Sequence, residues 1–223
     1  MPDSASMRSL LERLPDRLEW YKFGLELFCA EGPAALEPLH EMHKKIFLDL
    51  KLHDIPRTVA NAVRSASQHG IDMLTLHASG GAAMLAAAAV AAAEFGTDRP
   101  KLLAVTVLTS LDSADLASQG INRSTSEQVA ALARMAIEAG VDGLVCSAKE
   151  VGALRKELGP EPLLVTPGIR MPSGTADDQK RVATPADAVR DGASHLVVGR
   201  PITKAADPAA SLSEIEDNMA SAG

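Results

Sequence analysis

Short apolar segments alternate with longer helical patterns from one end of this chain to the other. The short segments are almost continuously apolar, which is typical of parallel strands that helices cover. A chain of 223 residues has room for one domain, since α/β barrels commonly run to about 200–250 residues. No low-complexity linker divides it, so we predict a single α/β domain over residues 1–223. The predicted strands span residues 18–23, 46–51, 73–77, 102–109, 143–147, 163–167 and 195–199, and the main helices span residues 57–69, 82–94, 126–139, 149–158, 185–190 and 208–219.

Seven predicted strands would suit an open, doubly wound sheet, but the polar residues favour a barrel. They fall at the ends of many different strands, as in a (β/α)₈ TIM barrel, whose active site is built from all the loops at one face. Residues 4–14 form a predicted helix capped by Ser4, and a helix that opens a barrel chain should follow a strand. We therefore predict a (β/α)₈ barrel whose first strand is missing from this chain.

Composition excludes several classes of partner. The net charge of −7 argues against nucleic acid or an anionic membrane, because both require clustered Lys and Arg. A small anionic ligand stays open, since it needs only a local group of donors. The most apolar stretch, residues 82–95, is far shorter than the roughly 20 residues of a membrane span. Cys29 and Cys146 sit in no metal or disulfide pattern, so we expect buried, reduced thiols and a cytoplasmic protein.

The most informative segment follows the second predicted strand. Side chains alternate along a strand, so Phe47, Asp49 and Lys51 should point one way, while Leu48 and Leu50 point the other. In a barrel the two leucines face the helices, and Asp49 and Lys51 look inward at the carboxyl end. Asp54 follows in the loop. An ion pair that merely closes the barrel would explain an isolated Asp-x-Lys equally well, because charges are common at strand ends.

Lys22 ends the preceding strand and extends this group. Alone it would suit a surface lysine, whose stem covers apolar surface while its charge stays in water. Combined with Asp49, Lys51 and Asp54, it would complete an alternating Lys–Asp–Lys–Asp network. Such a network holds charges in fixed positions and can favour one distribution of substrate charge over another.

The last two strand ends suggest an anion site. Arg170 follows one strand, and Gly199 and Arg200 follow the next. In barrels the loops after strands seven and eight commonly bind phosphate, and an arginine fork suits it. Residues 171–180 are long and polar enough for a lid. Weaker candidates for the pocket are His77 and Thr109, whereas no cluster has zinc, calcium or P-loop spacing.

Taken together, these motifs resemble the orotidine 5′-monophosphate decarboxylase family, most closely its bacterial type. The resemblance covers nearly the whole chain in order, and its most specific elements are the Ile-Pro-x-Thr extension and the paired Pro-Gly-Ile-Arg and Gly-Arg motifs. The matching segments are Asp49-x-Lys51-x-x-Asp54-Ile55-Pro56-x-Thr58, Lys22, residues 77–81, 106–110, 145–147 and 165–170, Asp178-Gln179 and residues 199–202.

The resemblance implies a cofactor-free and metal-free decarboxylation of orotidine 5′-monophosphate to UMP in pyrimidine biosynthesis. It assigns Lys51 as the proton donor to C6 of the pyrimidine. It places Asp49 against the substrate carboxylate, with the charge of Asp49 held in place by Lys22 and Lys51. It also implies a homodimer in which Asp54 and Thr58 reach the neighbouring site. The other implied substrate-binding residues are Ile55, Thr109, Arg170, Gln179, Gly199 and Arg200.

The sequence departs from the family at its start. In the family, the first barrel strand ends in an Asp that contacts the ribose, and this sequence contains neither that strand nor that Asp. We expect a natural protein that starts further upstream, the alternative being a chain with two unpaired barrel edges. Two rival functions stay open, namely a metal-dependent sugar-phosphate decarboxylase of the same fold and a non-catalytic nucleotide-binding remnant.

Overall fold

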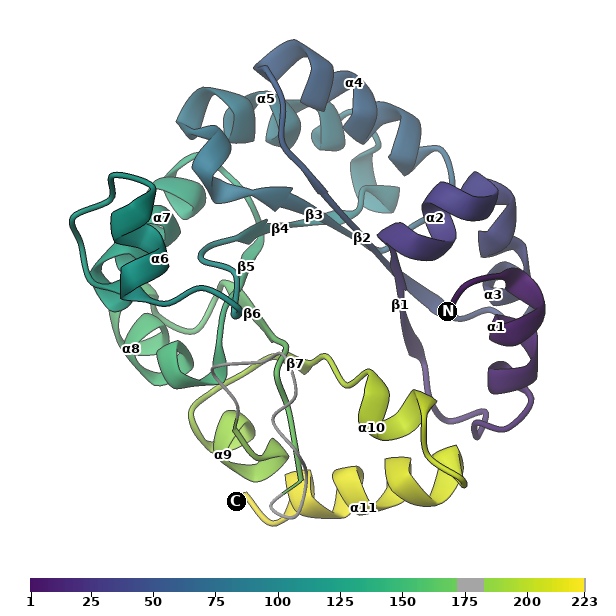
Figure 1. The fold of residues 1–223 in the computed structure, drawn as a ribbon. Helices are drawn as coiled ribbons and strands as arrows, with labels where there is room; N and C mark the ends of the chain where they lie inside the picture. The colour runs from purple at the N-terminus through teal and green to yellow at the C-terminus, as the bar shows by residue number, and fades with distance from the viewer. Residues whose placement is uncertain (172–182, 223) are drawn as a thin grey trace.

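The computed structural model describes residues 1–171 and 183–222. Within these residues, one parallel sheet contains seven strands in the order in which they occur in the sequence, from β1 to β7. Figure 1 shows the sheet curled into most of a ring with the helices outside it. The prediction of a barrel-like α/β fold with seven strands is confirmed. The strands are β1 (Trp20–Gly24), β2 (Lys45–Leu52), β3 (Met73–His77), β4 (Lys101–Val105), β5 (Gly143–Val145), β6 (Leu163–Thr166) and β7 (His195–Leu196).

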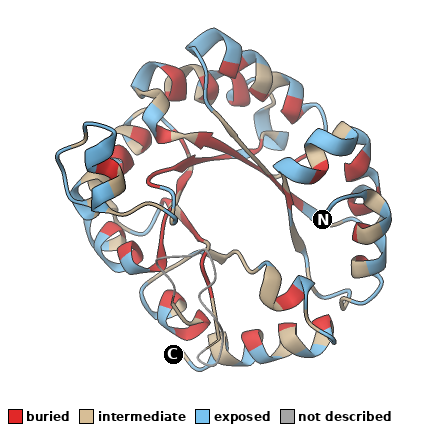
Figure 2. Ribbon diagram, in the orientation of Figure 1, coloured by how far each residue is buried: buried red, intermediate tan, exposed pale blue. Residues whose placement is uncertain are grey.

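The helices fill the connections between the strands. Most buried residues lie on the strands and on the helix faces turned toward them (Figure 2). In the described residues, no helix is long and apolar enough to cross a membrane. The α-helices are α1 (Ser4–Leu11), α2 (Leu25–Glu31), α3 (Glu37–Glu41), α4 (Pro56–Ser67), α5 (Ala82–Ala93), α6 (Ser113–Ser118), α7 (Thr125–Glu138), α8 (Ala148–Leu158), α9 (Pro185–Arg190), α10 (Arg200–Thr203) and α11 (Pro208–Ala220), and the 3₁₀ turns are η1 (Gly32–Leu36), η2 (Ala78–Gly80) and η3 (Gly96–Asp98).

Alternation along the strands separates two apolar layers. Phe47 of β2 packs inside the ring with Met73 and Val165. Its neighbour Leu48 packs in the larger layer between sheet and helices, as does Leu74. This division confirms that Asp49 shares the inward face with Phe47, because residues two apart lie on one face of a strand.

A repeated turn aligns the amino ends of the strands. Gly70 and Gly140 both adopt positive φ, 59° and 91°, which glycine accepts without a steric penalty. Two residues after each glycine, an aspartate carboxylate accepts a backbone N–H from the start of the preceding strand. Asp72 accepts the Ile46 N–H of β2 at 2.7 Å, and Asp142 accepts the Leu102 N–H of β4 at 2.8 Å. Ser194, just before β7, has the same role, since its hydroxyl accepts the Leu164 N–H of β6 at 3.0 Å. These side chains set the register of successive strands.

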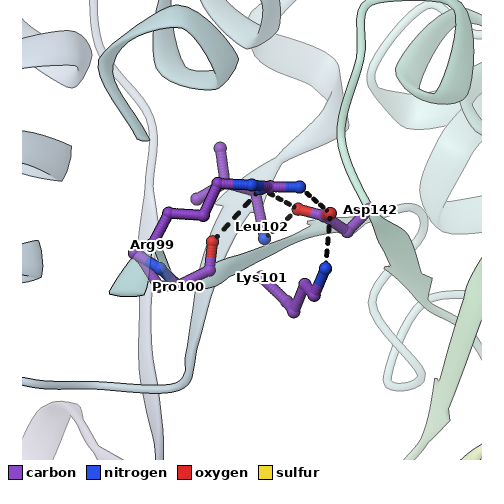
Figure 3. A network of polar contacts seen from close by, with 5 residues as sticks. All are labelled: Arg99, Pro100, Lys101, Leu102 and Asp142. Atoms are coloured by element: carbon purple, nitrogen blue, oxygen red, sulfur yellow. Dashed lines mark hydrogen bonds and ion pairs between the residues drawn. The ribbon is translucent and has the colours of Figure 1, made fainter. Parts of the chain in front are cut away.

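Asp142 forms the most extensive of these junctions (Figure 3). Arg99 donates two hydrogen bonds to its carboxylate, at 2.8 and 2.5 Å, and the Lys101 ammonium lies 3.5 Å away. Burial acts to raise the pKa of Asp142, but Arg99, the Leu102 N–H and Lys101 outweigh it and hold the pKa below its ordinary value. The charged carboxylate therefore stabilises the start of β4 and β5.

The two ends of the sheet are joined by side chains. In the described part of the chain, β1 pairs only with β2 and β7 only with β6. Leu14 and Leu18, which precede β1, pack against Leu212 of α11 and its apolar neighbours. Arg17 donates to the Glu216 carboxylate at 2.7 Å, and the Trp20 and His195 rings meet edge to face at 5.2 Å. The C-terminal helix thus bridges the gap between β7 and β1.

Several sequence predictions need correction, and besides strands 143–147 and 195–199, which end at Val145 and Leu196, three are instructive. The first helix is capped by Asp3, whose carboxylate accepts the Ser6 N–H at 2.7 Å, and not by Ser4, which already lies inside the helix. The predicted strand 102–109 ends at Val105, after which the chain turns toward α6. Cys146 is buried, but Cys29 is exposed on α2, because residues that adjoin it in sequence lie on a different face of the helix.

Replacing Asp142 with Asn should lower the free energy of unfolding at neutral pH by about 1–3 kcal/mol, since a buried charged acceptor is lost. The folded-state pKa of Asp142 lies below its ordinary value of 3.8, so its contribution is present above about pH 4 and disappears as pH falls through the folded pKa. Urea unfolding of both proteins should therefore converge at low pH. Asp217→Asn, at an exposed site on α11, is the control. A difference that is independent of pH would contradict this account.

Candidate active site

A cavity of about 430 Å³ opens at the carboxyl ends of the strands. Its size is in the usual range for small-molecule sites. It gathers residues from β1 and β2 and from the segments that follow β4, β6 and β7. Seven of the predicted site residues line it, namely Lys22, Asp49, Lys51, Thr109, Arg170, Gly199 and Arg200.

One carboxylate in this cavity holds two ammonium groups. The Lys22 Nζ lies 3.1 Å from Asp49 Oδ2, and the Lys51 Nζ lies 2.8 Å from Asp49 Oδ1. The side chain of Asp49 is only 12% exposed. Lys22 reaches it because the parallel register places Gly24, two residues further along β1, beside Asp49.

The charges alter the acidity of Asp49. Burial acts to raise its pKa, but Lys22 and Lys51 together outweigh burial and hold the pKa below the ordinary value. Asp49 is therefore ionised at neutral pH, and both ammonium groups face a fixed negative charge. A carboxylate saturated in this way has little remaining capacity to bind a metal ion.

Lys51 has an unusual backbone. Its φ of 51° lies in the left-handed region that residues with side chains seldom adopt. The register between β2 and β3 also shifts between Leu48 and Leu52. The hydroxyl of Thr75 on β3 accepts the Lys51 N–H at 2.8 Å and donates to Asp49 at 3.0 Å. Backbone strain at a residue of a charged cavity is a common feature of functional sites.

His77 ends β3 next to this group. Burial, followed by the charges of His53 and Lys51, lowers the pKa of His77, so its ring is neutral at physiological pH. The rings of His53 and His77 lie 5.3 Å apart. Neither histidine lines the cavity.

The segments after β6 and β7 contribute the two arginines of the cavity. Arg170 follows β6, and its guanidinium donates to the Ile169 carbonyl at 2.8 Å. Gly199 precedes the short helix α10, which begins at Arg200. The two guanidinium groups and the lysine–aspartate cluster thus share one cavity, as the sequence predicted.

Three of the predicted site residues do not line the cavity. Asp54, Ile55 and Thr58 are exposed and do not line the cavity, and Ile55 is 66% exposed. The Asp54 carboxylate accepts the Ile55 N–H at 2.6 Å. Gln179 and most of the predicted lid at 171–180 lie outside the described residues.

Sequence reasoning missed most of the apolar wall of the site. The apolar residues that line the cavity include Phe47, Val105, Val145, Cys146 and Val197. Phe47 was expected on the same face as Asp49, because it lies two residues before it on the same strand, and it lines the cavity beside Asp49 and Lys51. The role of Thr75 had no signal in the sequence, since it depends on the shifted register. Within residues 1–171 and 183–222, no group of three or more His, Cys, Asp or Glu side chains is suited to a metal ion.

A parallel α/β sheet curled into a barrel, with a charged cavity at the carboxyl ends of its strands, defines the chain as a TIM-barrel type of enzyme. Residues 1–215 match the model of the orotidine 5′-phosphate decarboxylase / HUMPS family. The chain therefore belongs to this family, and the resemblance seen in its motifs is confirmed.

Individual relatives agree with the family assignment. Orotidine 5′-phosphate decarboxylase from Moorella thermoacetica is 50% identical over 220 residues, which cover 96% of this chain and 87% of the relative. The protein of that name from Neisseria gonorrhoeae is 52% identical over 195 residues, or 87% and 79% of the two chains. The crystal structure of orotidine 5′-phosphate decarboxylase from Lactobacillus acidophilus aligns with a TM-score of 0.86 at 39% identity, covering 98% of this chain and 95% of the other.

Replacing Lys22 with Met should raise the pKa of Asp49, because burial then opposes ionisation with only one ammonium group against it. Carbon-13 NMR titration of the aspartate side chains measures this shift. Lys45→Met is the matched control, because Lys45 begins β2 at its other end and pairs with Glu19 at 3.2 Å. An unchanged Asp49 titration in the Lys22 variant would show that Lys22 does not hold this charge.

Proposed function

We propose that this protein decarboxylates orotidine 5′-monophosphate to UMP in pyrimidine biosynthesis, without a metal or organic cofactor. The observation that carries the proposal is the Lys22–Asp49–Lys51 cluster in the same cavity as Arg170 and Arg200. Relatives that are about half identical bear the name of this enzyme. We place the reaction in the cytoplasm, in keeping with two cysteines that are both free.

Lys51 is the proposed proton donor. When the bond between C6 and the carboxylate breaks, its electron pair stays on C6 and carbon dioxide leaves. An ammonium group held beside C6 stabilises that developing charge and then transfers a proton to the carbon. The 2.8 Å contact between Lys51 and Asp49 supports this role, because the ammonium is held in place before substrate arrives.

Asp49 and Lys22 complete the reacting end of the site. Asp49 would lie against the substrate carboxylate, with Lys22 holding its charge in position. As carbon dioxide loses the negative charge that faces Asp49, the arrangement favours the transition state over the bound substrate. Thr109 would contact the pyrimidine from the loop after β4.

The phosphate would bind at the other end of the cavity. Arg170, Gly199 and Arg200 supply donors there, and Gln179 would add a further contact from the lid. Binding energy from the distant phosphate can lower the barrier at C6 when it drives closure of the site.

The active unit is proposed to be a homodimer. Asp54 and Thr58 are exposed just beyond β2 and would reach the ribose in the neighbouring site. Ile55 lies between them with an apolar side chain that is 66% exposed, as expected of a residue covered by a partner. Analytical ultracentrifugation tests the assembly.

Lys51→Ala should lower kcat by more than about 1,000-fold, since it removes both the fixed charge and the proton. Binding of UMP should persist, because the arginines remain. Decarboxylation is followed by the loss of orotate absorbance, and UMP binding by calorimetry. Lys45→Ala, on the same strand but outside the cavity, is the control.

Outcomes of that experiment separate the rival functions. Turnover by the Lys51→Ala protein at the natural rate would refute the role of Lys51. UMP binding without turnover in the natural sequence would indicate a non-catalytic nucleotide-binding protein. Activity on a sugar phosphate that requires added magnesium would indicate the metal-dependent decarboxylase.

Arg200→Ala should lower kcat/KM for orotidine 5′-monophosphate roughly 10- to 100-fold and weaken UMP binding, since a charge-assisted hydrogen bond is lost. Steady-state kinetics and calorimetry check both effects. Arg190→Ala is the control, because Arg190 lies on α9 and pairs with Asp187 on the surface. Unchanged UMP affinity in the Arg200 variant would exclude a phosphate contact.

A further inference from the structure

We propose that Thr75 is a positioning residue for the decarboxylation, because its buried hydroxyl fixes the backbone of Lys51 and the carboxylate of Asp49 together. This inference rests on the proposed function of the site. Thr75 lies on β3, does not line the cavity and would not touch the substrate. It acts through Lys51 and Asp49, which line the cavity.

The direction of each hydrogen bond follows from the groups involved. The Lys51 N–H can only donate, so Thr75 Oγ1 accepts it at 2.8 Å. The ionised carboxylate of Asp49 can only accept, so the same hydroxyl donates its proton to Oδ1 at 3.0 Å. This carboxylate oxygen also receives the Lys51 Nζ at 2.8 Å. One hydroxyl therefore links the Lys51 backbone to the same Asp49 oxygen that binds the Lys51 ammonium group.

The strand register explains why a side chain is needed here. Leu48 pairs with Leu74, and the next pair is Leu52 with Leu76. Residues 49–51 of β2 therefore lie opposite Thr75 alone, and the regular ladder of backbone bonds is interrupted. The Thr75 hydroxyl takes the place of the missing ladder acceptor for the Lys51 N–H.

This bulge determines where the Lys51 ammonium points. With a φ of 51°, Lys51 adopts a conformation that its own side chain disfavours, so surrounding contacts must hold it. Thr75 is fully buried, which keeps water from replacing the hydroxyl. Without it, Lys51 would relax toward ordinary strand geometry and its Nζ would move away from the reacting carbon.

Thr75→Val tests the proposal, because valine keeps the shape of the side chain and removes the hydroxyl. We expect kcat to fall about 100-fold, since small misplacements of a reacting group have effects of that size. UMP affinity should stay near its natural value, because the arginines and the apolar wall are unchanged. Thr75→Ser restores the hydroxyl and should recover most of the rate.

Thr166→Val is the matched control. Thr166 is also fully buried at the end of a parallel strand, β6, and its hydroxyl has no hydrogen-bond partner in the described residues. Its replacement should leave kcat unchanged. A comparable loss of rate in this control would show a general effect of packing and overturn the proposal.

Three other results would also overturn it, namely natural kcat in Thr75→Val, equal losses of kcat and UMP affinity, and a serine variant as slow as the valine variant. If Thr75→Val does not fold, Thr75→Cys is compared with Thr75→Ser, since the two match in shape and the thiol bonds weakly. Equal rates in that pair would refute the proposal. If the natural sequence itself does not decarboxylate the substrate, the proposed function fails instead.

Discussion

The active-site end of this structure depends on the ion pairs that the carboxylate of Asp49 forms with Lys22 and Lys51. This carboxylate lies 12% exposed between Lys22 and Lys51, and its two oxygens are divided between their ammonium groups. Removing Asp49 would leave two ammonium groups close together without the negative charge between them, a state that folding disfavours strongly. The arrangement is therefore both a structural junction between β1 and β2 and the source of the field inside the cavity. The same carboxylate oxygens of Asp49 therefore contribute both to the stability of the fold and to the chemistry of the cavity.

The amino ends of the strands carry the contacts that set register, and the carboxyl ends carry the charged groups of the cavity. At the amino ends, Asp72, Asp142 and Ser194 bind backbone N–H groups and set strand register. At the carboxyl ends, Asp49 instead directs its oxygens to side-chain cations and to the Thr75 hydroxyl. Register fixed at one end thus determines which side chains meet at the other. Lys22 and Asp49 come together only because β1 and β2 are aligned correctly over their whole length.

Much of this could be predicted from the sequence, for reasons that differ between residues. The alternation rule placed Asp49 and Lys51 on the inward face, and the order of the motifs brought Arg170 and Arg200 into the same cavity. The left-handed backbone of Lys51 could not be predicted, because it arises from the register between β2 and β3. The contact of Arg99 with Asp142 was equally hidden, since it joins residues 43 apart. The exposure of Cys29 was mispredicted because its neighbours in sequence are not its neighbours in space.

The bridge between Arg17 and Glu216 has a consequence for how the molecule assembles. Each strand pairs with the next strand in the chain, so the sheet can grow by adding one unit at a time. The bridge instead joins residues 199 apart and encloses almost the whole polypeptide in one loop. The entropic cost of closing a loop rises with its length, so this contact becomes favourable only when the intervening units are already ordered. The curled shape is therefore completed late, by a helix from one end of the chain reaching a loop near the other.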